Sequence, residues 1–292
     1  MNVYVDDIGY RSYSIKRIVS AFKDYSPPTV NVVDNQEEAD LILVHVYGRI
    51  NRVRRRVELL KQQGKQYAVM QYTLRHSLNP NTTDWLDIWD GSAGVWSYLN
   101  LARMANEDGN KFCCNFYYAP LGVDTKVFYP QNLEKKYQIL TTGANYMTEG
   151  VRECVIASEH VGRFKSVHFG VKLSNPNVDS FVDASDDTYT DALNRSIYVA
   201  GLRRGEGFEL PAAEGLVCGI RPILFAKEHY ITWYNNLGIF VVENSREILI
   251  NDLKTIFTGE EIPVKDYQIE DAKSRFDWNK LITGFWNNLW IR

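Results

Sequence analysis

Two glutamates separated by seven residues carry the clearest chemical signal in the chain. Glu206 lies in a glycine-containing loop, and Glu214 lies in the segment that follows, which has a helical pattern. Pro211 suits the first turn of a helix, where no backbone N–H is needed, and Gly207 permits a tight turn before it. The backbone N–H groups of residues 208–210 would then face outward at a helix N-terminus, which is a site suited to a diphosphate.

The two carboxylates would have different tasks at such a site. An ionised carboxylate accepts two hydrogen bonds at once, so Glu214, about one turn into the helix, could hold a pair of sugar hydroxyls. Glu206, on the loop before the helix, would face whatever group the phosphate carries. Two glutamates at this spacing are also typical of a solvated helix face, and spacing alone leaves both interpretations open.

The elements that must position these residues alternate between strand and helix patterns. Residues 2–7 predict a strand, and the continuous apolar run Leu41–Val46 suits a central parallel strand that is covered on both faces. A polar stretch at 129–136 indicates a linker, after which the alternation begins again at Tyr137 and includes a polar, acidic segment at 175–187. We therefore expect an α/β fold of two Rossmann-like domains facing a central cleft, with ligands beyond the carboxyl ends of the strands.

The segment around the two glutamates resembles the E-x7-E signature of retaining glycosyltransferases with the GT-B fold, especially glycosyltransferase family four. Residues 206–214 have the form Glu-Gly-Phe-x-Leu-Pro-x-x-Glu, and 218–223 have the form Cys-Gly-x-x-Pro-Ile. Three further segments follow in the family's order. Residues 119–130 are similar to the segment before the second domain, 137–143 to that domain's first strand, and 276–286 to the terminal helix that crosses back to the first domain. With these neighbours, a solvated helix face becomes the weaker interpretation.

The resemblance implies a GT-B enzyme with domains at 1–130 and 131–275 and a crossover helix at 276–292. Such an enzyme moves a sugar from a nucleotide-diphosphate sugar to a hydroxyl acceptor with retention of anomeric configuration. It needs no cofactor beyond this co-substrate, and the departing phosphate, rather than a protein nucleophile, helps the acceptor hydroxyl to lose its proton. By the same likeness Glu214 would hold the ribose and Glu206 would contact the transferred sugar. The residues implied to border the diphosphate are Gly143, Gly207, Phe208, Glu209 and Leu210.

Two positions depart from the family's pattern. The family usually has an arginine directly after the glycine of the strand and a lysine a few residues on, whereas here Ala144 and Glu149 take those places. Losing two cations beside a leaving diphosphate could remove on the order of several kcal/mol of transition-state stabilisation. We expect Arg203 and Arg204 to replace them, unless both lie in a solvated loop. The departures keep open a degenerate protein that binds nucleotide or glycan without transfer, and also a phosphorylase or epimerase on the same scaffold.

The first domain of the family carries a histidine near the transferred sugar, on the loop after a central strand. His76 follows its strand in this way, and the alternative is a plain loop residue. His45 lies inside an apolar run and is expected to be a hydrogen-bonded core histidine. Gly9 and Tyr10, on the loop after the first strand, are candidates for contact with the donor or the acceptor.

One basic segment stands out from a chain whose net charge is -3. That net charge argues against a protein that coats nucleic acid over its whole surface. Residues 49–65 are rich in arginine and lysine, and apolar residues recur at helical spacing from Ile50 to Leu60. The opposite face of this helix is either solvated or binds an anionic acceptor, such as a phosphodiester backbone or an acidic membrane surface. Its candidate residues are Arg52, Arg55 and Arg56.

Composition limits the class of protein further. A chain of 292 residues with 45% hydrophobic and 24% charged residues is globular and long enough for two cores. No apolar run approaches the roughly 18 residues of a membrane-spanning helix, and Asp6 and Asp7 stand where a signal peptide would carry positive charge. The four cysteines have no zinc-ligand or disulfide pattern, and Asp186-Asp187 belongs to a polar run rather than a DxD metal motif. We therefore expect a cytoplasmic, metal-independent protein.

Overall fold

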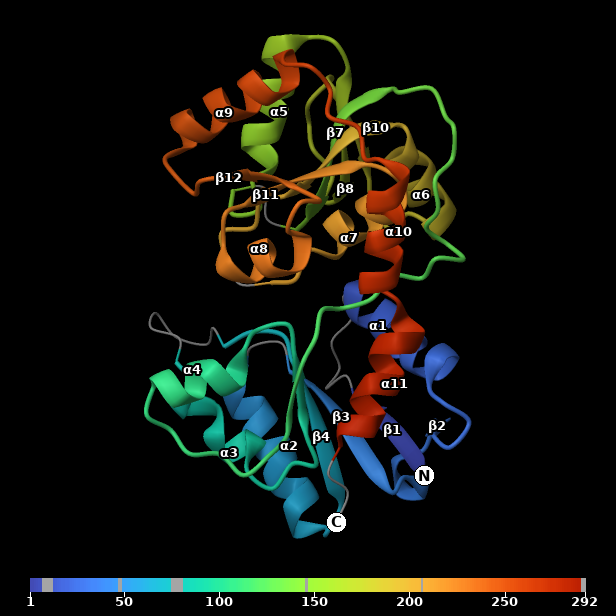
Figure 1. The fold of residues 1–292 in the computed structure, drawn as a ribbon, viewed down its shortest axis with the longest axis vertical. Helices are drawn as coiled ribbons and strands as arrows, with labels where there is room; N and C mark the ends of the chain where they lie inside the picture. The colour runs from blue at the N-terminus through green and yellow to red at the C-terminus, as the bar shows by residue number, and fades with distance from the viewer. Residues whose placement is uncertain (7–12, 47–48, 75–80, 145–146, 206, 290–292) are drawn as a thin grey trace. The chain divides into compact units, whose positions relative to one another are not determined.

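The chain forms two compact units, each built on one parallel sheet (Figure 1). Unit 1 comprises Met1–Leu121 and Trp278–Arg292, and unit 2 comprises Gly122–Asp277. This α/β architecture is the one predicted from the alternation of strand and helix patterns. The computed structural model describes residues 1–6, 13–46, 49–74, 81–144, 147–205 and 207–289.

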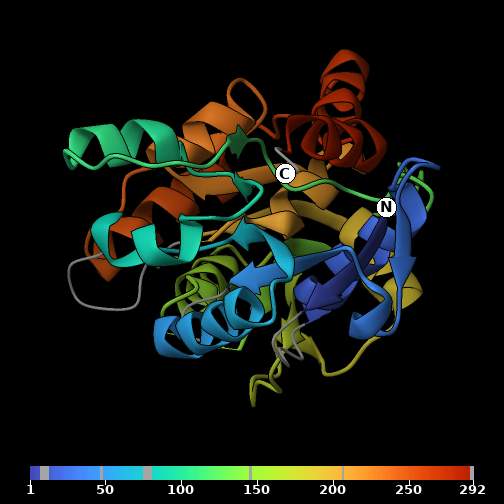
Figure 2. The same cartoon turned by 90° about the horizontal axis from the view of Figure 1, so that it is seen from below.

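The sheet of unit 1 has six strands in the order β2-β1-β3-β4-β5-β6, and every pairing is parallel. All six residues of β3 are buried, as expected for a central strand covered on both faces. Seen from below, the blue-to-teal strands fan out with the twist common to parallel sheets (Figure 2). The strands are β1 (Asn2–Asp6), β2 (Asn31–Val33), β3 (Leu41–Val46), β4 (Gln66–Gln71), β5 (Val95–Ser97) and β6 (Phe116–Tyr118).

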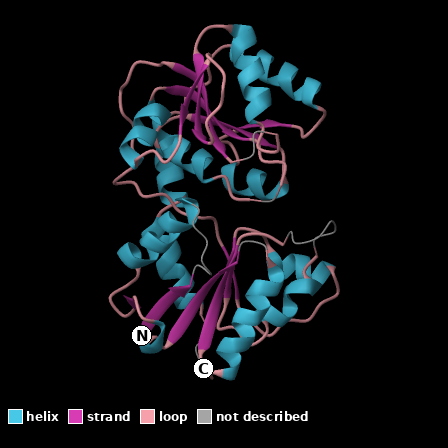
Figure 3. Ribbon diagram, turned by 180° about the vertical axis from the view of Figure 1, so that it is seen from behind, coloured by secondary structure: helices cyan, strands magenta, loops and turns pink. Residues whose placement is uncertain are grey.

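Helices cover both faces of this sheet, α1 and α11 on one side and α2, α3 and α4 on the other (Figure 3). The rings of Phe22 and Phe285 lie 6.2 Å apart and those of Trp96 and Phe285 lie 5.2 Å apart, so α11 packs into the core of unit 1. The apolar stripe predicted for α2 is confirmed, since Val53, Val57 and Leu60 are buried. The helices are α1 (Tyr13–Tyr25), α2 (Ile50–Gln62), α3 (Leu86–Trp89), α4 (Leu101–Glu107) and α11 (Trp278–Asn288), with short 3-10 turns at Gln36–Glu38 and Thr83–Trp85.

The sheet of unit 2 also has six parallel strands, in the order β12-β11-β10-β7-β8-β9. One of them, β9, lies inside the polar, acidic segment 175–187 and pairs only with β8, at the edge of the sheet. The strands are β7 (Tyr137–Gly143), β8 (Lys165–Gly170), β9 (Val178–Phe181), β10 (Ser196–Gly201), β11 (Arg221–Phe225) and β12 (Ile239–Val241).

Among the described residues of unit 2, six helices pack around this second sheet, with α5 beside α9 and α7 beside α10. Ser185 and Ser245 cap α6 and α9 by accepting hydrogen bonds from backbone N–H groups in the first turn. The helix predicted from residue 210 to 217 is confirmed with these bounds. No helix among the described residues combines the length and apolar character needed to cross a bilayer. The helices are α5 (Val151–Val161), α6 (Asp186–Asn194), α7 (Leu210–Val217), α8 (Glu228–Tyr234), α9 (Arg246–Thr258) and α10 (Asp266–Arg275).

The strand order reverses between β7 and β10, and their carboxyl ends part there. The two strands pair as far as Leu140 and Val199. Beyond that point Gly143 of β7 pairs with β8, and Gly201 of β10 pairs with β11. Ligands of open α/β sheets bind where strand ends separate in this way. The corresponding place in unit 1 lies between β1 and β3.

Candidate functional site

The place where β7 and β10 part, which we call the switch point of unit 2, includes Gly143, a residue without a side chain. Gly143 ends β7 with φ of +131°, a conformation that favours glycine. A Cβ atom added at Gly143 would collide with the carboxylate of Glu149, and one added at Gly170 would collide with the carbonyl of Gly143. Glycine is therefore required at Gly170 by the neighbouring backbone and favoured at Gly143 by its positive φ, and the space left by the missing side chain of Gly143 is occupied by the carboxylate of Glu149.

Arg203 lies between two carboxylates at this point. Its Nη2 atom is 3.3 Å from Oε1 of Glu149, and its Nε atom is 3.3 Å from Oε1 of Glu209. The side chains are 25%, 14% and 3% exposed for Arg203, Glu149 and Glu209, so water screens these charges only in part. The arginine side chain passes over Gly207, where an added Cβ would lie 3.0 Å from its Cδ. We refer to Glu149, Arg203 and Glu209 as the Arg203 trio.

The first turn of α7 is held by tyrosines of α8. Glu209 precedes this helix, and its Oε1 accepts a 3.1 Å hydrogen bond from the Tyr230 hydroxyl. The Tyr234 hydroxyl donates to the carbonyl oxygen of Glu209 at 2.8 Å. The Leu210 amide, which was expected to face outward, donates instead to the carbonyl of Phe208. Phe208 in turn packs against the ring of Tyr234.

Arg204, the second expected replacement cation, is also paired. Its Nη2 atom donates to Oε1 of Glu153 at 3.2 Å, and its Nη1 atom lies 3.8 Å from Oε1 of Glu243. Glu153 is fully buried at the start of α5 and has a second cation, Arg246, at 3.5 Å. Arg203 and Arg204 thus lie just beyond the end of β10, and each of them already has two carboxylates beside it.

Two residues near this site, Lys227 and His229, lie outside the E-x7-E segment, so the motif did not predict them. Lys227 follows β11, and its ammonium group donates to the carbonyl oxygens of three successive residues, 203–205, at 2.8, 3.0 and 3.3 Å. Burial, reinforced by the charge of Lys227, lowers the pKa of His229 to about 4. Lys227 lies just after the carboxyl end of β11, and His229 lies in the first turn of the helix α8 that follows; a position near a strand's carboxyl end is the signal that could have identified them.

Of the remaining donor-side candidates, Glu214 lies among the described residues and the others do not. Glu214 lies on α7, one turn beyond its start, and is 2% exposed. Burial, reinforced by the charge of Glu214, raises the pKa of the nearby Cys218 thiol to about 12. The other candidates fall outside the described residues: Gly9, Tyr10, His76 and Glu206.

In unit 1 the structure separates the three arginines of the expected basic face. Arg56 turns toward the end of β1, where its Nε atom donates to Oδ2 of Asp6 at 2.5 Å, and its guanidinium also contacts Gln36. Arg52 and Arg55 are exposed near the N-terminus of α2. Together with Arg49 they line an open hollow of about 570 Å³. The basic face therefore consists of Arg52 and Arg55 without Arg56.

His45 is the core histidine that its apolar surroundings predicted. It is fully buried in β3, and its Nδ1 atom lies 2.7 Å from the hydroxyl of Tyr72, which is also buried. Burial lowers the pKa of His45 to about 3. The histidine is therefore neutral at physiological pH and bonds within the core.

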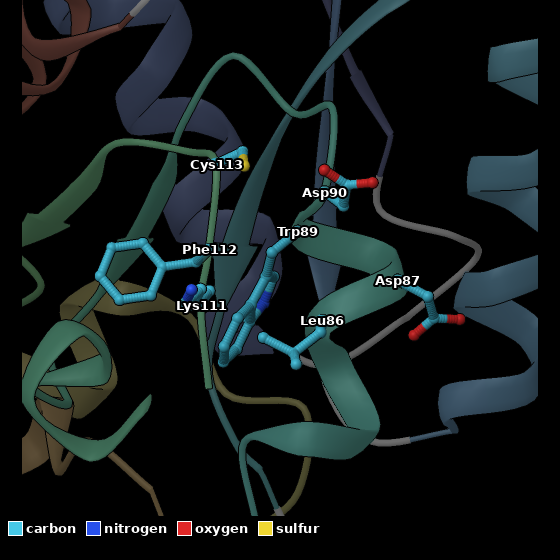
Figure 4. Close-up of a pocket in the computed structure, with 7 residues that line it drawn as sticks. All are labelled: Leu86, Asp87, Trp89, Asp90, Lys111, Phe112 and Cys113. Carbon is cyan, nitrogen blue, oxygen red and sulfur yellow. The ribbon is translucent and has the colours of Figure 1, made fainter. Parts of the chain in front are cut away.

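A second hollow, of about 230 Å³, lies beside α3, near the amino end of β6 (Figure 4). Asp87 is paired with Arg54 at 2.6 Å. The side chains of Asp87 and Asp90 point away from the ring of Trp89 (Figure 4). Ligand pockets have convergent polar groups, and this hollow does not. Its lining residues are Leu86, Asp87, Trp89, Asp90, Lys111, Phe112 and Cys113.

No protein-family model matches the sequence, and no curated protein matches it. Solved structures do match. Sucrose-phosphate synthase from Thermosynechococcus elongatus has a TM-score of 0.71 at 11% identity, over 98% of this chain and 97% of that one. Anabaena HepE, in complex with UDP, has a TM-score of 0.69 at 11% identity, over 98% of each chain. AviGT4, a glycosyltransferase involved in avilamycin A biosynthesis, has 0.65 at 11% identity, over 99% and 96%. These likenesses confirm the predicted GT-B fold.

Proposed function

We propose that the chain transfers a sugar from a nucleotide-diphosphate sugar to a hydroxyl acceptor, with retention of anomeric configuration. One observation carries the proposal: residues 209–214 of the E-x7-E segment build the start of α7 at the switch point of unit 2, linked through Arg203 and Glu149 to Gly143 at the end of β7. Open α/β sheets bind nucleotides at such a point. The likeness of the whole chain to glycosyltransferase structures supports the same function.

The donor would be held by groups from several strand ends. Gly143 allows a phosphate to approach the backbone closely, as glycines do in dinucleotide-binding folds. Glu214, on α7, would accept hydrogen bonds from the two ribose hydroxyls. Glu206 would contact the transferred sugar, and His76 would lie near it. Because the HepE structure contains UDP, UDP is the first nucleotide to test.

The acceptor side belongs to unit 1 in this proposal. Arg52 and Arg55 expose their guanidinium groups near the start of α2, just after β3, one of the two strands at the switch point of unit 1. Guanidinium groups pair well with phosphate oxygens because their donors form a planar fork. We therefore propose an acceptor that carries an anionic group.

A second candidate function is binding of nucleotide or glycan without transfer. The observation that favours it is the pairing of both available arginines: Arg203 with Glu149 and Glu209, and Arg204 with Glu153 and Glu243. Charge develops on the leaving diphosphate during transfer, and cations that are already neutralised stabilise it less. Binding does not require stabilisation of this developing charge, so a nucleotide could bind without transfer.

Hydrolysis of nucleotide sugars separates the two functions. The rate is measured for the parent chain, for Glu206→Ala and for Glu260→Ala, an exposed glutamate of the same unit. Transfer predicts a loss of roughly 100-fold or more in Glu206→Ala alone. Thermal stabilisation by UDP is measured in parallel, since a ligand at 100 times its Kd stabilises by about 2.7 kcal/mol. If UDP stabilises the protein but all three proteins hydrolyse nucleotide sugars at the same background rate, the binding function remains and the enzymatic function is excluded.

A further inference from the structure

One carboxylate already lies on the bare backbone at the end of β7. A Cβ atom at Gly143 would overlap the carboxylate carbon and both oxygens of Glu149. Those three atoms therefore fill the space that the missing side chain leaves open. Glycine at this kind of strand end serves to let an anion reach the backbone, and here the anion comes from the protein itself.

Neighbouring backbone contacts define the position of Glu149. The carbonyl of Thr148 accepts a 2.9 Å hydrogen bond from the amide of Arg204. On the other side, Gly150 has φ of +69° and packs so closely on Leu202 that any Cβ there would collide with it. The residues before and after Glu149 are thus both tied to the strand end of β10. These contacts place the backbone of Glu149 near the strand end of β10, and from there its carboxylate reaches Gly143 and Arg203.

Glu149 is not needed to neutralise Arg203. The guanidinium has Glu209 as a second partner at 3.3 Å, and Glu209 is buried and further held by Tyr230. With both carboxylates present, the Arg203 trio has a net negative charge. A phosphate that approached Gly143 would be repelled by Glu149, and it would have to take over the contact with Arg203.

We infer that Glu149 is a specificity-determining residue that competes with the diphosphate of the donor for Gly143 and Arg203. The inference rests on the proposed function, because it assigns a part to Glu149 within the same donor site. As a consequence, Glu149 should weaken the binding of a nucleotide more strongly when the nucleotide carries more phosphate charge. Removing the charge of Glu149 while keeping its shape frees Arg203 for one phosphate and leaves Glu209 in place.

Calorimetric titration of the full chain with UDP, UMP and uridine tests this competition. The variants are Glu149→Gln, Glu149→Lys and the exposed control Glu260→Gln, each checked for folding by circular dichroism. We expect Glu149→Gln to bind UDP at least tenfold more tightly than the parent, which corresponds to ~1.4 kcal/mol. The gain should be smaller for UMP and absent for uridine, and Glu149→Lys should bind UDP at least as tightly as Glu149→Gln. Glu260→Gln should match the parent with all three ligands.

The outcomes distinguish this inference from the proposed function. If UDP binds the parent and both Glu149 variants with the same Kd, or binds the variants more weakly, the inference is overturned and the donor site stands. A gain of the same size for uridine also overturns it, since uridine has no phosphate to repel. If none of the proteins binds any of the three ligands, the proposed function fails and the inference fails with it.

Discussion

The ammonium group of Lys227 donates a 2.8 Å hydrogen bond to the carbonyl oxygen of Arg203. The same group bonds the carbonyls of Arg204 and Gly205 and lies 3.3 Å from the carboxylate of Glu243. One cation at the end of β11 therefore shapes the loop that leads from β10 to α7. This loop carries Arg203 and Arg204, so the conformation of the loop determines where the two arginines are placed.

Replacing Lys227 by methionine should disturb this loop more than the fold. Methionine keeps an unbranched chain but leaves three carbonyl oxygens without their shared donor. We expect a loss of roughly 1–3 kcal/mol in the free energy of unfolding and a fall of about tenfold in UDP affinity. Urea denaturation and calorimetry measure the two effects. Lys254→Met, on α9, serves as the control, and identical results for the two variants would contradict the role assigned to Lys227.

Arg204 should matter mainly for stability, because its partner Glu153 is fully buried. Arg204→Met leaves that carboxylate with Arg246 alone, at 3.5 Å. We expect a loss of roughly 2–3 kcal/mol in the free energy of unfolding, somewhat below that for a buried charge with no remaining partner. Adding Glu153→Gln should restore part of it. Arg195→Met, which breaks an exposed pair with Asp191, should cost at most about 0.5 kcal/mol. Equal losses in the two single variants would exclude a special role for Arg204.

Stability should fall in acid because of His45. Burial lowers its pKa to about 3, whereas an unfolded chain binds the proton near pH 6.5. Between these values only the unfolded state is protonated, so stability is highest above pH 6.5 and declines as the pH falls. From pH 7 to pH 5 the parent should lose ~2 kcal/mol more than His45→Asn, which cannot be protonated in this range. Urea denaturation at both values measures the difference. His160→Asn, at an exposed position, should behave as the parent, and parallel losses in parent and His45→Asn would refute the prediction.

The arginines of α2 should separate into two functional groups. Charge reversal by Arg52→Glu with Arg55→Glu should abolish binding of an anionic acceptor and leave the free energy of unfolding within about 0.5 kcal/mol of the parent, because both side chains are exposed. Arg56→Met should instead lower stability, because it removes the guanidinium that pairs with Asp6, whose side chain is only 13% exposed. Retention on phosphate-bearing beads and urea denaturation measure the two effects. Undiminished retention of the doubly reversed variant would exclude Arg52 and Arg55 from acceptor binding.

Patterns within the sequence predicted most elements of the fold. The apolar run Leu41–Val46 and the helix at 210–217 appear with the expected bounds, because burial on both faces and the start of a helix are marked by adjacent residues. The strand β9 shows the limit of such patterns. Its four residues, Val178–Phe181, alternate too briefly among polar neighbours to signal a strand, and pairing with β8 supplies the hydrogen bonds that make it one.

The candidate site shows the same division more sharply. The sequence by itself determined that a glycine ends β7 and that two glutamates flank the start of α7, since both features belong to short continuous segments. Only the tertiary structure decided that Glu149 covers Gly143, that Arg203 lies between two carboxylates and that Lys227 holds the loop beneath them. These groups come from the ends of three different strands. Their distances depend on how the sheet is ordered, and pairing between charges far apart in the chain leaves no periodic trace in the sequence.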